Sequence, residues 1–173
     1  MIFVTTGSQK FQFNRLLQKI DSLIEEGIVR EEVYAQIGES DYLPRHYEYC
    51  TFLDRESFAR KMKECSMVIT HGGTGAIIGA VKQGKKVIAV PRLARFGEHV
   101  DDHQVQLLGE FDGMNLICAC YDIKKLGECI RDTAGREFAG YHSNTHRILT
   151  DIENFLDAEE GELHEHRKHT KIS

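Results

Sequence analysis

Hydrophobic residues follow this chain in short continuous runs, separated by stretches in which apolar positions recur every three or four residues. The continuous runs predict strands at 2–5, 33–37, 47–53, 67–70, 87–90 and 116–119. The helical spacing predicts helices at 11–24, 58–65, 77–83, 105–111, 123–133 and 145–157. Gly27 fits the end of the first helix, because glycine is the usual residue just past a helix C-terminus.

Strands that alternate with helices predict an α/β fold with right-handed crossovers and a mostly parallel sheet. The strands are apolar without interruption, as expected when helices cover both faces of a sheet. A length of 173 residues suits one such domain. We expect that domain to span 1–158 and a polar tail to span 159–173. The tail histidines are interpreted as solvated residues rather than metal ligands: His164, His166 and His169.

Charge and composition exclude several classes of protein. There are 22 Lys and Arg against 27 Asp and Glu, and a net charge of -5 argues against nucleic-acid binding. No apolar run approaches the roughly 20 residues of a membrane helix, and the first residues predict a strand rather than a signal peptide. The five cysteines lack metal-ligand spacing, and we interpret them as reduced core residues of a cytosolic protein.

Three loops follow predicted strands at 6–10, 70–75 and 91–104. They should share one edge, because ligands of open parallel sheets bind beyond the carboxyl ends of the strands. The middle loop, Thr70-His71-Gly72-Gly73-Thr74-Gly75, leads directly into a helix. Its glycines would let a phosphate approach the helix N-terminus, whereas the alternative is a tight turn without a ligand. It matches neither a Walker loop nor a G-x-G-x-x-G fingerprint, so a nicotinamide cofactor is disfavoured.

The third loop is polar and predicts either a ligand-facing surface or a solvated charged loop. Asp101 or Asp102 can cap the helix that begins there. His103 and Gln104 would then lie in its first turn and face the cleft, where a Gln can bond two sugar hydroxyls. Arg92 adds a cation that could stabilise a negatively charged ligand.

Three motifs in order carry a resemblance to a known family. They are Phe3-Val4-Thr5-Thr6-Gly7-Ser8, Val68-Ile69-Thr70-His71-Gly72-Gly73-Thr74-Gly75, and Val90-Pro91-Arg92 through Asp101-Asp102-His103-Gln104. From residue 1 to about 155 the chain resembles the glycosyltransferase family 28 C-terminal domain, the Rossmann-like donor half of GT-B glycosyltransferases. Within that family it looks most like exopolysaccharide subunits of the PssE or EpsF type. It is also similar to the catalytic subunit of the dolichol-pathway UDP-GlcNAc transferase.

The resemblance implies a UDP-sugar donor, no bound cofactor and no catalytic metal, since a D-x-D element is missing. It implies inverting, metal-independent transfer by direct displacement. His71, His99 and Glu98 are candidate bases by residue type, with a base from a partner as the alternative. Gly79 stands where relatives carry an acidic residue, which is ribose-binding in the peptidoglycan pathway. The implied donor-binding residues lie on all three loops: Gly7, Ser8, Gln9, Gly72, Gly73, Thr74, Gly75, Arg92, His103 and Gln104.

A GT-B enzyme has two such halves, and this length supplies one. The resemblance therefore implies a hexosyltransferase subunit with a membrane-attached partner that binds a lipid-linked sugar acceptor, in exopolysaccharide or capsule synthesis. The expected location is cytoplasmic, at the inner face of the plasma membrane through that partner, and a homo-oligomer is possible in isolation. One alternative is a non-catalytic enhancer subunit of a transferase complex. Another is a nucleotide hydrolase or epimerase that acts alone.

Overall fold

The computed structural model describes residues 1–142, 147, 150, 151 and 154. The chain divides into two compact units, Met1–Tyr141 and His142–Ser173, and the first contains all the strands and helices named below. The predicted boundary between 158 and 159, the tail histidines and most of the predicted helix at 145–157 lie outside the described residues.

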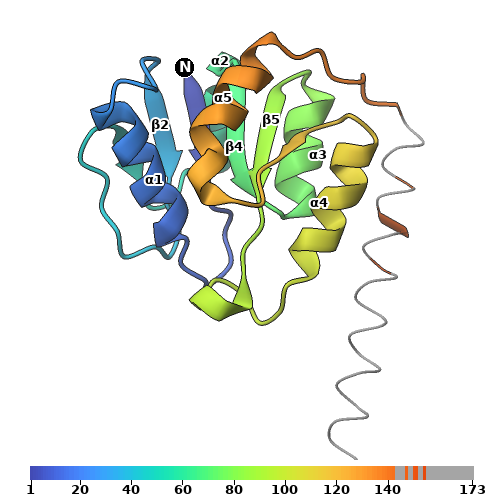
Figure 1. Ribbon diagram of the computed structural model, residues 1–173, viewed down its shortest axis with the longest axis horizontal. Helices are drawn as coiled ribbons and strands as arrows, with labels where there is room; N and C mark the ends of the chain where they lie inside the picture. The colour runs from blue at the N-terminus through green and yellow to red at the C-terminus, as the bar shows by residue number, and fades with distance from the viewer. Residues whose placement is uncertain (143–146, 148–149, 152–153, 155–173) are drawn as a thin grey trace, which may run out of the picture. The chain divides into compact units, whose positions relative to one another are not determined.

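Six strands form one parallel sheet, which confirms the predicted α/β class (Figure 1). Their order is β3-β2-β1-β4-β5-β6, and each neighbouring pair is parallel. In the central pair, Val4 of β1 lies beside Ile69 of β4. The strand bounds are β1 Ile2–Thr5, β2 Val33–Gln36, β3 Glu48–Cys50, β4 Met67–His71, β5 Lys86–Val90 and β6 Cys118–Ala119.

The helices fall between the strands, as the apolar spacing predicts. They are α1 Asn14–Glu25, α2 Arg55–Glu64, α3 Thr74–Lys82, α4 His103–Gly113 and α5 Leu126–Gly135. Short 3-10 turns precede α4 and α5, at Ala94–Phe96 (η1) and Ile123–Lys125 (η2). The first helix begins three residues later than predicted, because the Phe13 N–H donates to Ser40 Oγ and the Asn14 N–H to Gln12 Oε1. Among the described helices, none has the length and apolar character needed to span a bilayer.

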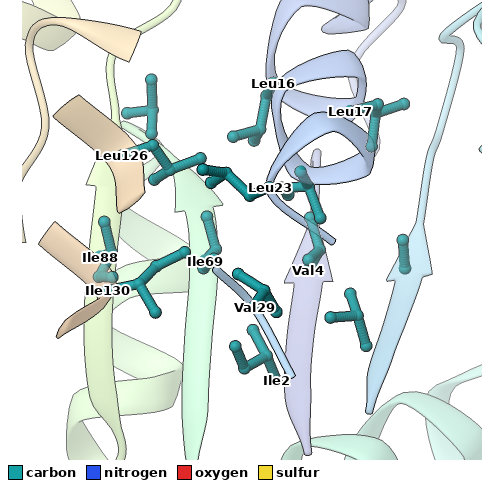
Figure 2. Close-up of a cluster of buried hydrophobic side chains, with 14 of the residues drawn as sticks. Ile2, Val4, Leu16, Leu17, Leu23, Val29, Ile69, Ile88, Leu126 and Ile130 are labelled. Atoms are coloured by element: carbon teal, nitrogen blue, oxygen red, sulfur yellow. The ribbon is translucent and has the colours of Figure 1, made fainter. Parts of the chain in front are cut away.

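Helices cover both faces of the sheet, with α1 and α5 in front and α2 and α3 behind in Figure 1. Alternate strand residues therefore enter different layers: Val4 packs in the α1–α5 core, while Phe3 meets Phe58 of α2 edge to face at 5.2 Å. Figure 2 shows the front core, in which branched side chains from α1 and α5 meet those of four central strands. The labelled residues are Ile2, Val4, Leu16, Leu17, Leu23, Val29, Ile69, Ile88, Leu126 and Ile130.

The strand order positions the loops. The chain moves outward from β1 to β2 and β3, then returns across β1 to β4, so the direction of the order reverses between β1 and β4. In doubly wound folds the loops after two such strands lead to opposite sides, and ligands bind there, beyond the carboxyl ends of the strands. The segments after β1, β4 and β5 all lie at this edge, at the bottom of Figure 1.

Candidate functional site

His71, the last residue of β4, lies beneath two loops and is only 7% exposed. A Cβ at Gly7 would lie 2.5 Å from the ring carbon Cε1, and a Cβ at Gly73 would also overlap the ring. Gly7 in addition has φ +77°, which favours glycine. These glycines are thus required because the backbones of the first and second loops pack directly on the imidazole.

The His71 imidazole is held neutral by its surroundings. Burial, and then the nearby positive charge of Arg92, lowers the pKa of His71 to about 4. Its Nδ1 lies 3.3 Å from Thr70 Oγ1. At neutral pH the ring therefore acts as an uncharged wedge between two loops, and proton uptake there is costly.

Gln104 joins the second loop to the third. Its Oε1 accepts hydrogen bonds from the Gly72 N–H and the Arg92 N–H, both at 3.0 Å, and the residue is 3% exposed. A Cβ at Gly72 would lie 2.7 Å from the Gln104 Cβ, so the side chain and the loop are in close contact. Gln104 is predicted to bind the donor sugar, but its amide oxygen is occupied by these two backbone N–H groups, while Nε2 bonds to no described residue.

The N-terminus of α3 opens between these loops. Its N-cap, Gly73, offers no side chain to satisfy the first N–H groups of the helix. Thr74 Oγ1 is buried without a hydrogen-bond partner in the part of the chain that the structure describes. A Cβ at Gly75 would meet nothing within 4 Å, so space lies beside the first turn. Unpaired N–H groups and a positive dipole end are what an anion requires.

Arg92 places a buried positive charge against the first loop. The guanidinium is 0% exposed, donates from Nη2 to the Thr6 carbonyl at 2.5 Å and stacks 5.4 Å from the Phe13 ring centroid. Burial lowers its pKa to about 10, so it stays charged at neutral pH. Nε and Nη1 have no partner among the described residues. Arg92 therefore acts on the first loop from beneath rather than at the surface.

Comparison with known proteins shows the family to which this chain belongs. Residues 1–151 match the model of the glycosyltransferase family 28 C-terminal domain. The chain belongs to this family. Its single α/β domain with a six-stranded parallel sheet is that of a GT-B C-terminal half, which confirms the fold that the resemblance implies. No curated protein matches the chain.

Solved glycosyltransferases share the fold. A structure of the glycotransferase of kitacinnamycin is 14% identical, with a TM-score of 0.56 over 91% of this chain. CalG4, the calicheamicin glycosyltransferase, is 15% identical, with a TM-score of 0.52 over 86% of this chain. Acinetobacter baumannii MurG is 16% identical, with a TM-score of 0.54 over 78%. This chain spans 39%, 36% and 41% of these three structures, so it corresponds to less than half of each.

Glu98, a candidate base of this family 28 domain, lies in a buried ion pair. Its carboxylate accepts from Arg15 Nε at 2.9 Å and Arg15 Nη2 at 2.8 Å, and from the Leu93 N–H at 3.0 Å. The residue is 1% exposed. The bidentate pair ties the third loop to α1, and taking up a proton would break it. This geometry favours a positioning role for Glu98.

His99 and His103 converge on Asp101. His99 Nδ1 lies 3.1 Å from Asp101 Oδ1, and His103 Nδ1 bonds to the same oxygen. The His103 N–H also donates to it at 3.1 Å, so Asp101 satisfies the first N–H of α4 from the position before the N-cap, while the N-cap residue Asp102 makes no side-chain cap bond. The sequence predicts Asp101 only as a possible helix cap, although the H-x-D-x-H spacing from 99 to 103 is a signal of the cluster.

The remaining predicted residues lie on the first loop. Ser8 and Gln9 are exposed beyond Gly7, at the same edge as the α3 N-terminus. At Gly79, where the resemblance implies an acidic residue, a Cβ would meet nothing within 4 Å, so the structure leaves room for a side chain.

Proposed function

We propose that this chain is the donor-binding subunit of a UDP-sugar-dependent hexosyltransferase. The observation that carries the proposal is the uncapped N-terminus of α3, with the buried, unpartnered Thr74 hydroxyl beside it and the Arg92 charge beneath the neighbouring loop. A diphosphate would accept hydrogen bonds from these N–H groups and from Thr74. The fold supports this, because the site lies where the strand order reverses.

Transfer would be a direct displacement that inverts the anomeric carbon. The acceptor hydroxyl oxygen forms the new bond to that carbon, the bond to the UDP oxygen breaks, and the acceptor proton passes to a base. Backbone N–H groups, the α3 dipole and Arg92 stabilise the charge that develops on the departing diphosphate, so the step needs no metal ion there. His103 and the Gln104 amide nitrogen are the proposed donor-sugar contacts.

Of the predicted sources of the catalytic base, two remain in this proposal. His71 is buried and neutral, and Glu98 is engaged by Arg15. His99 keeps Nε2 as an acceptor if its Nδ1 proton bonds to Asp101, since a neutral imidazole carries one proton. The other source is a partner subunit. Loss of transfer in His99→Ala with unchanged UDP affinity would identify His99, and full activity would identify the partner.

The partner is part of the proposal. This chain spans only 36–41% of the GT-B structures that it resembles, so more than half of each has no counterpart in it. We propose that a membrane-attached subunit supplies the acceptor half and a lipid-linked acceptor. The complex would then act at the cytoplasmic membrane face in exopolysaccharide or capsule synthesis, as a PssE or EpsF type subunit. Co-expression with a candidate partner should convert donor binding into sugar transfer.

Calorimetry with UDP, UDP-glucose, UDP-galactose, UDP-N-acetylglucosamine and UDP-glucuronic acid tests donor binding. Thr74→Val should weaken UDP binding about tenfold, the effect of one lost hydrogen bond to a charged group. Thr133→Val is the matched control, because Thr133 Oγ1 is also buried without a partner among the described residues but lies in α5. No affinity for UDP or any UDP-sugar, alone and with the partner, would refute the proposal.

Measuring sugar transfer by the complex distinguishes a donor-binding subunit from the alternative, a non-catalytic enhancer subunit. A triple variant that replaces Thr74, His103 and Gln104 should abolish transfer if this chain binds the donor. If the complex with that variant keeps its activity, the chain supports a transferase without binding the donor. Turnover of a UDP-sugar by the pure chain, without acceptor or partner, would instead favour a solitary hydrolase or epimerase.

A further inference from the structure

Three side chains at and just before the start of α4 form a set of potential metal ligands, a role that the proposed transfer does not assign to them. His99, Asp101 and His103 come within five residues of one another, and their potential ligand atoms all lie within 4.8 Å. The two imidazole rings stand edge to face with centroids 4.9 Å apart, and both direct Nδ1 toward one carboxylate oxygen. Two nitrogens and one oxygen thus face a common point.

The chemistry of these atoms selects a class of ion. Imidazole nitrogen and carboxylate oxygen together suit Zn²⁺ and similar borderline ions, whereas Mg²⁺ and Ca²⁺ prefer oxygen ligands alone. Zn²⁺ binds such ligands at about 2.0–2.1 Å, which puts neighbouring ligand atoms of a tetrahedral site roughly 3.4 Å apart. The distance of 3.1 Å from His99 Nδ1 to Asp101 Oδ1 needs only a small side-chain shift to reach that spacing. Three protein ligands leave a fourth position for water.

The cluster is held in place and is still reachable. Its side chains are 9%, 26% and 19% exposed for His99, Asp101 and His103 respectively. Phe11 packs against the His99 ring at 5.2 Å, and the backbone N–H of His103 fixes Asp101 Oδ1. Little ordering is therefore needed when an ion enters, because the ligands already converge.

We propose that His99, Asp101 and His103 form a binding site for one Zn²⁺ or a chemically similar divalent ion. The ion would connect the loop that precedes α4 to the first turn of that helix, directly before Gln104 and its hydrogen bonds to the second and third loops. The proposal does not rest on donor binding, because ion binding is measured without a nucleotide. It does bear on catalysis: an imidazole that binds a metal through Nδ1 carries its proton on Nε2. A filled site would therefore remove His99 as a base and leave the partner as its source.

Histidines in the tail could also bind Zn²⁺, so the experiment begins with a full-length variant that replaces them, His164→Asn/His166→Asn/His169→Asn. Zn²⁺ calorimetry and Co²⁺ absorption spectra should show one tight ion in the natural chain and in this variant. A further pair, His99→Ala/His103→Ala in the same background, should weaken Zn²⁺ binding at least 100-fold and abolish the Co²⁺ visible bands. Zn²⁺ should raise the melting temperature only where the cluster is intact.

Two single variants keep the test decisive if the double variant folds poorly. Asp101→Asn is nearly isosteric and should weaken Zn²⁺ binding at least tenfold, whereas Asp102→Asn should leave it unchanged. Asp102 is the matched control because its Oδ1 accepts from the Ala94 N–H rather than joining the cluster. Zn²⁺ binding that disappears with the tail histidines, or that survives at full strength in Asp101→Asn and in His99→Ala/His103→Ala, would overturn the proposal.

Discussion

The buried imidazole of His71 should make the stability of this domain fall as the pH is lowered. Its pKa is about 4 in the folded protein, against an ordinary value of 6.5 that the unfolded chain should show. Between these two values the unfolded state binds a proton that the folded state refuses. The stability contributed by the neutral ring is therefore complete above about pH 6.5 and is lost progressively down to about pH 4.

The shift gives the size of the effect. Each pKa unit corresponds to about 1.4 kcal/mol, so the complete loss is roughly 3 kcal/mol. At about pH 5 the expected loss is roughly 2 kcal/mol relative to about pH 7.5. This loss is a large part of the free energy of unfolding of a whole domain, which is typically about 5–15 kcal/mol.

Urea unfolding of the natural chain and of His71→Asn, near pH 7.5 and near pH 5, measures this contribution. Asparagine does not titrate, so His71→Asn should lose about 2 kcal/mol less than the natural chain between the two pH values. The smaller side chain lowers stability at both pH values, and that cost cancels in the difference. Gly84→Ala controls for destabilisation alone, because a Cβ there meets nothing within 4 Å. An equal loss in the natural chain and in His71→Asn would refute the reasoning.

Three further changes test the contacts around this ring. Gly7→Ala should cost about 2 kcal/mol more than Gly84→Ala, since both have positive φ but only a Cβ at Gly7 overlaps His71; equal urea midpoints would contradict the packing. Gln104→Ala should cost about 2–4 kcal/mol by leaving two buried N–H groups unpaired, whereas the exposed Gln106→Ala should cost under about 0.5. Glu98→Ala should cost about 3–5 kcal/mol by stranding Arg15, and thermal denaturation that shows no loss would exclude a buried ion pair.

The parallel sheet and the alternation of strands and helices along the chain were predictable, because each strand has a local signal, a continuous apolar run. Val87 to Val90 are apolar without a break, and the structure buries all four on the sheet. Element starts were less predictable where a distant side chain decides them, as Ser40 does by holding the Phe13 N–H just before α1. A single sequence carries no signal that residues 27 apart will meet.

The roles of the site residues show the same difference between local signals and contacts that are distant in the sequence. The glycine-rich turn into α3 and the cap near Asp101 follow from local spacing, and the structure places both at the carboxyl edge. The partners of Gln104 lie 32 and 12 residues away, and those of Glu98 include Arg15, 83 residues away. A polar residue type indicates that a side chain can bond, but only the fold decides whether it bonds to a ligand or to the backbone.

Buried polar groups fasten the three loops to one another before any ligand arrives. Arg92 joins the first loop to the third through the Thr6 carbonyl, Gln104 joins the second to the third, and His71 separates the first from the second. Changes at these residues should therefore lower stability and donor affinity together. Thr74 differs, because its hydroxyl bonds to no described residue and removing it costs the free domain no contact. A loss of UDP affinity in Thr74→Val without a loss of stability would thus separate the surface that binds the donor from the framework that holds it open.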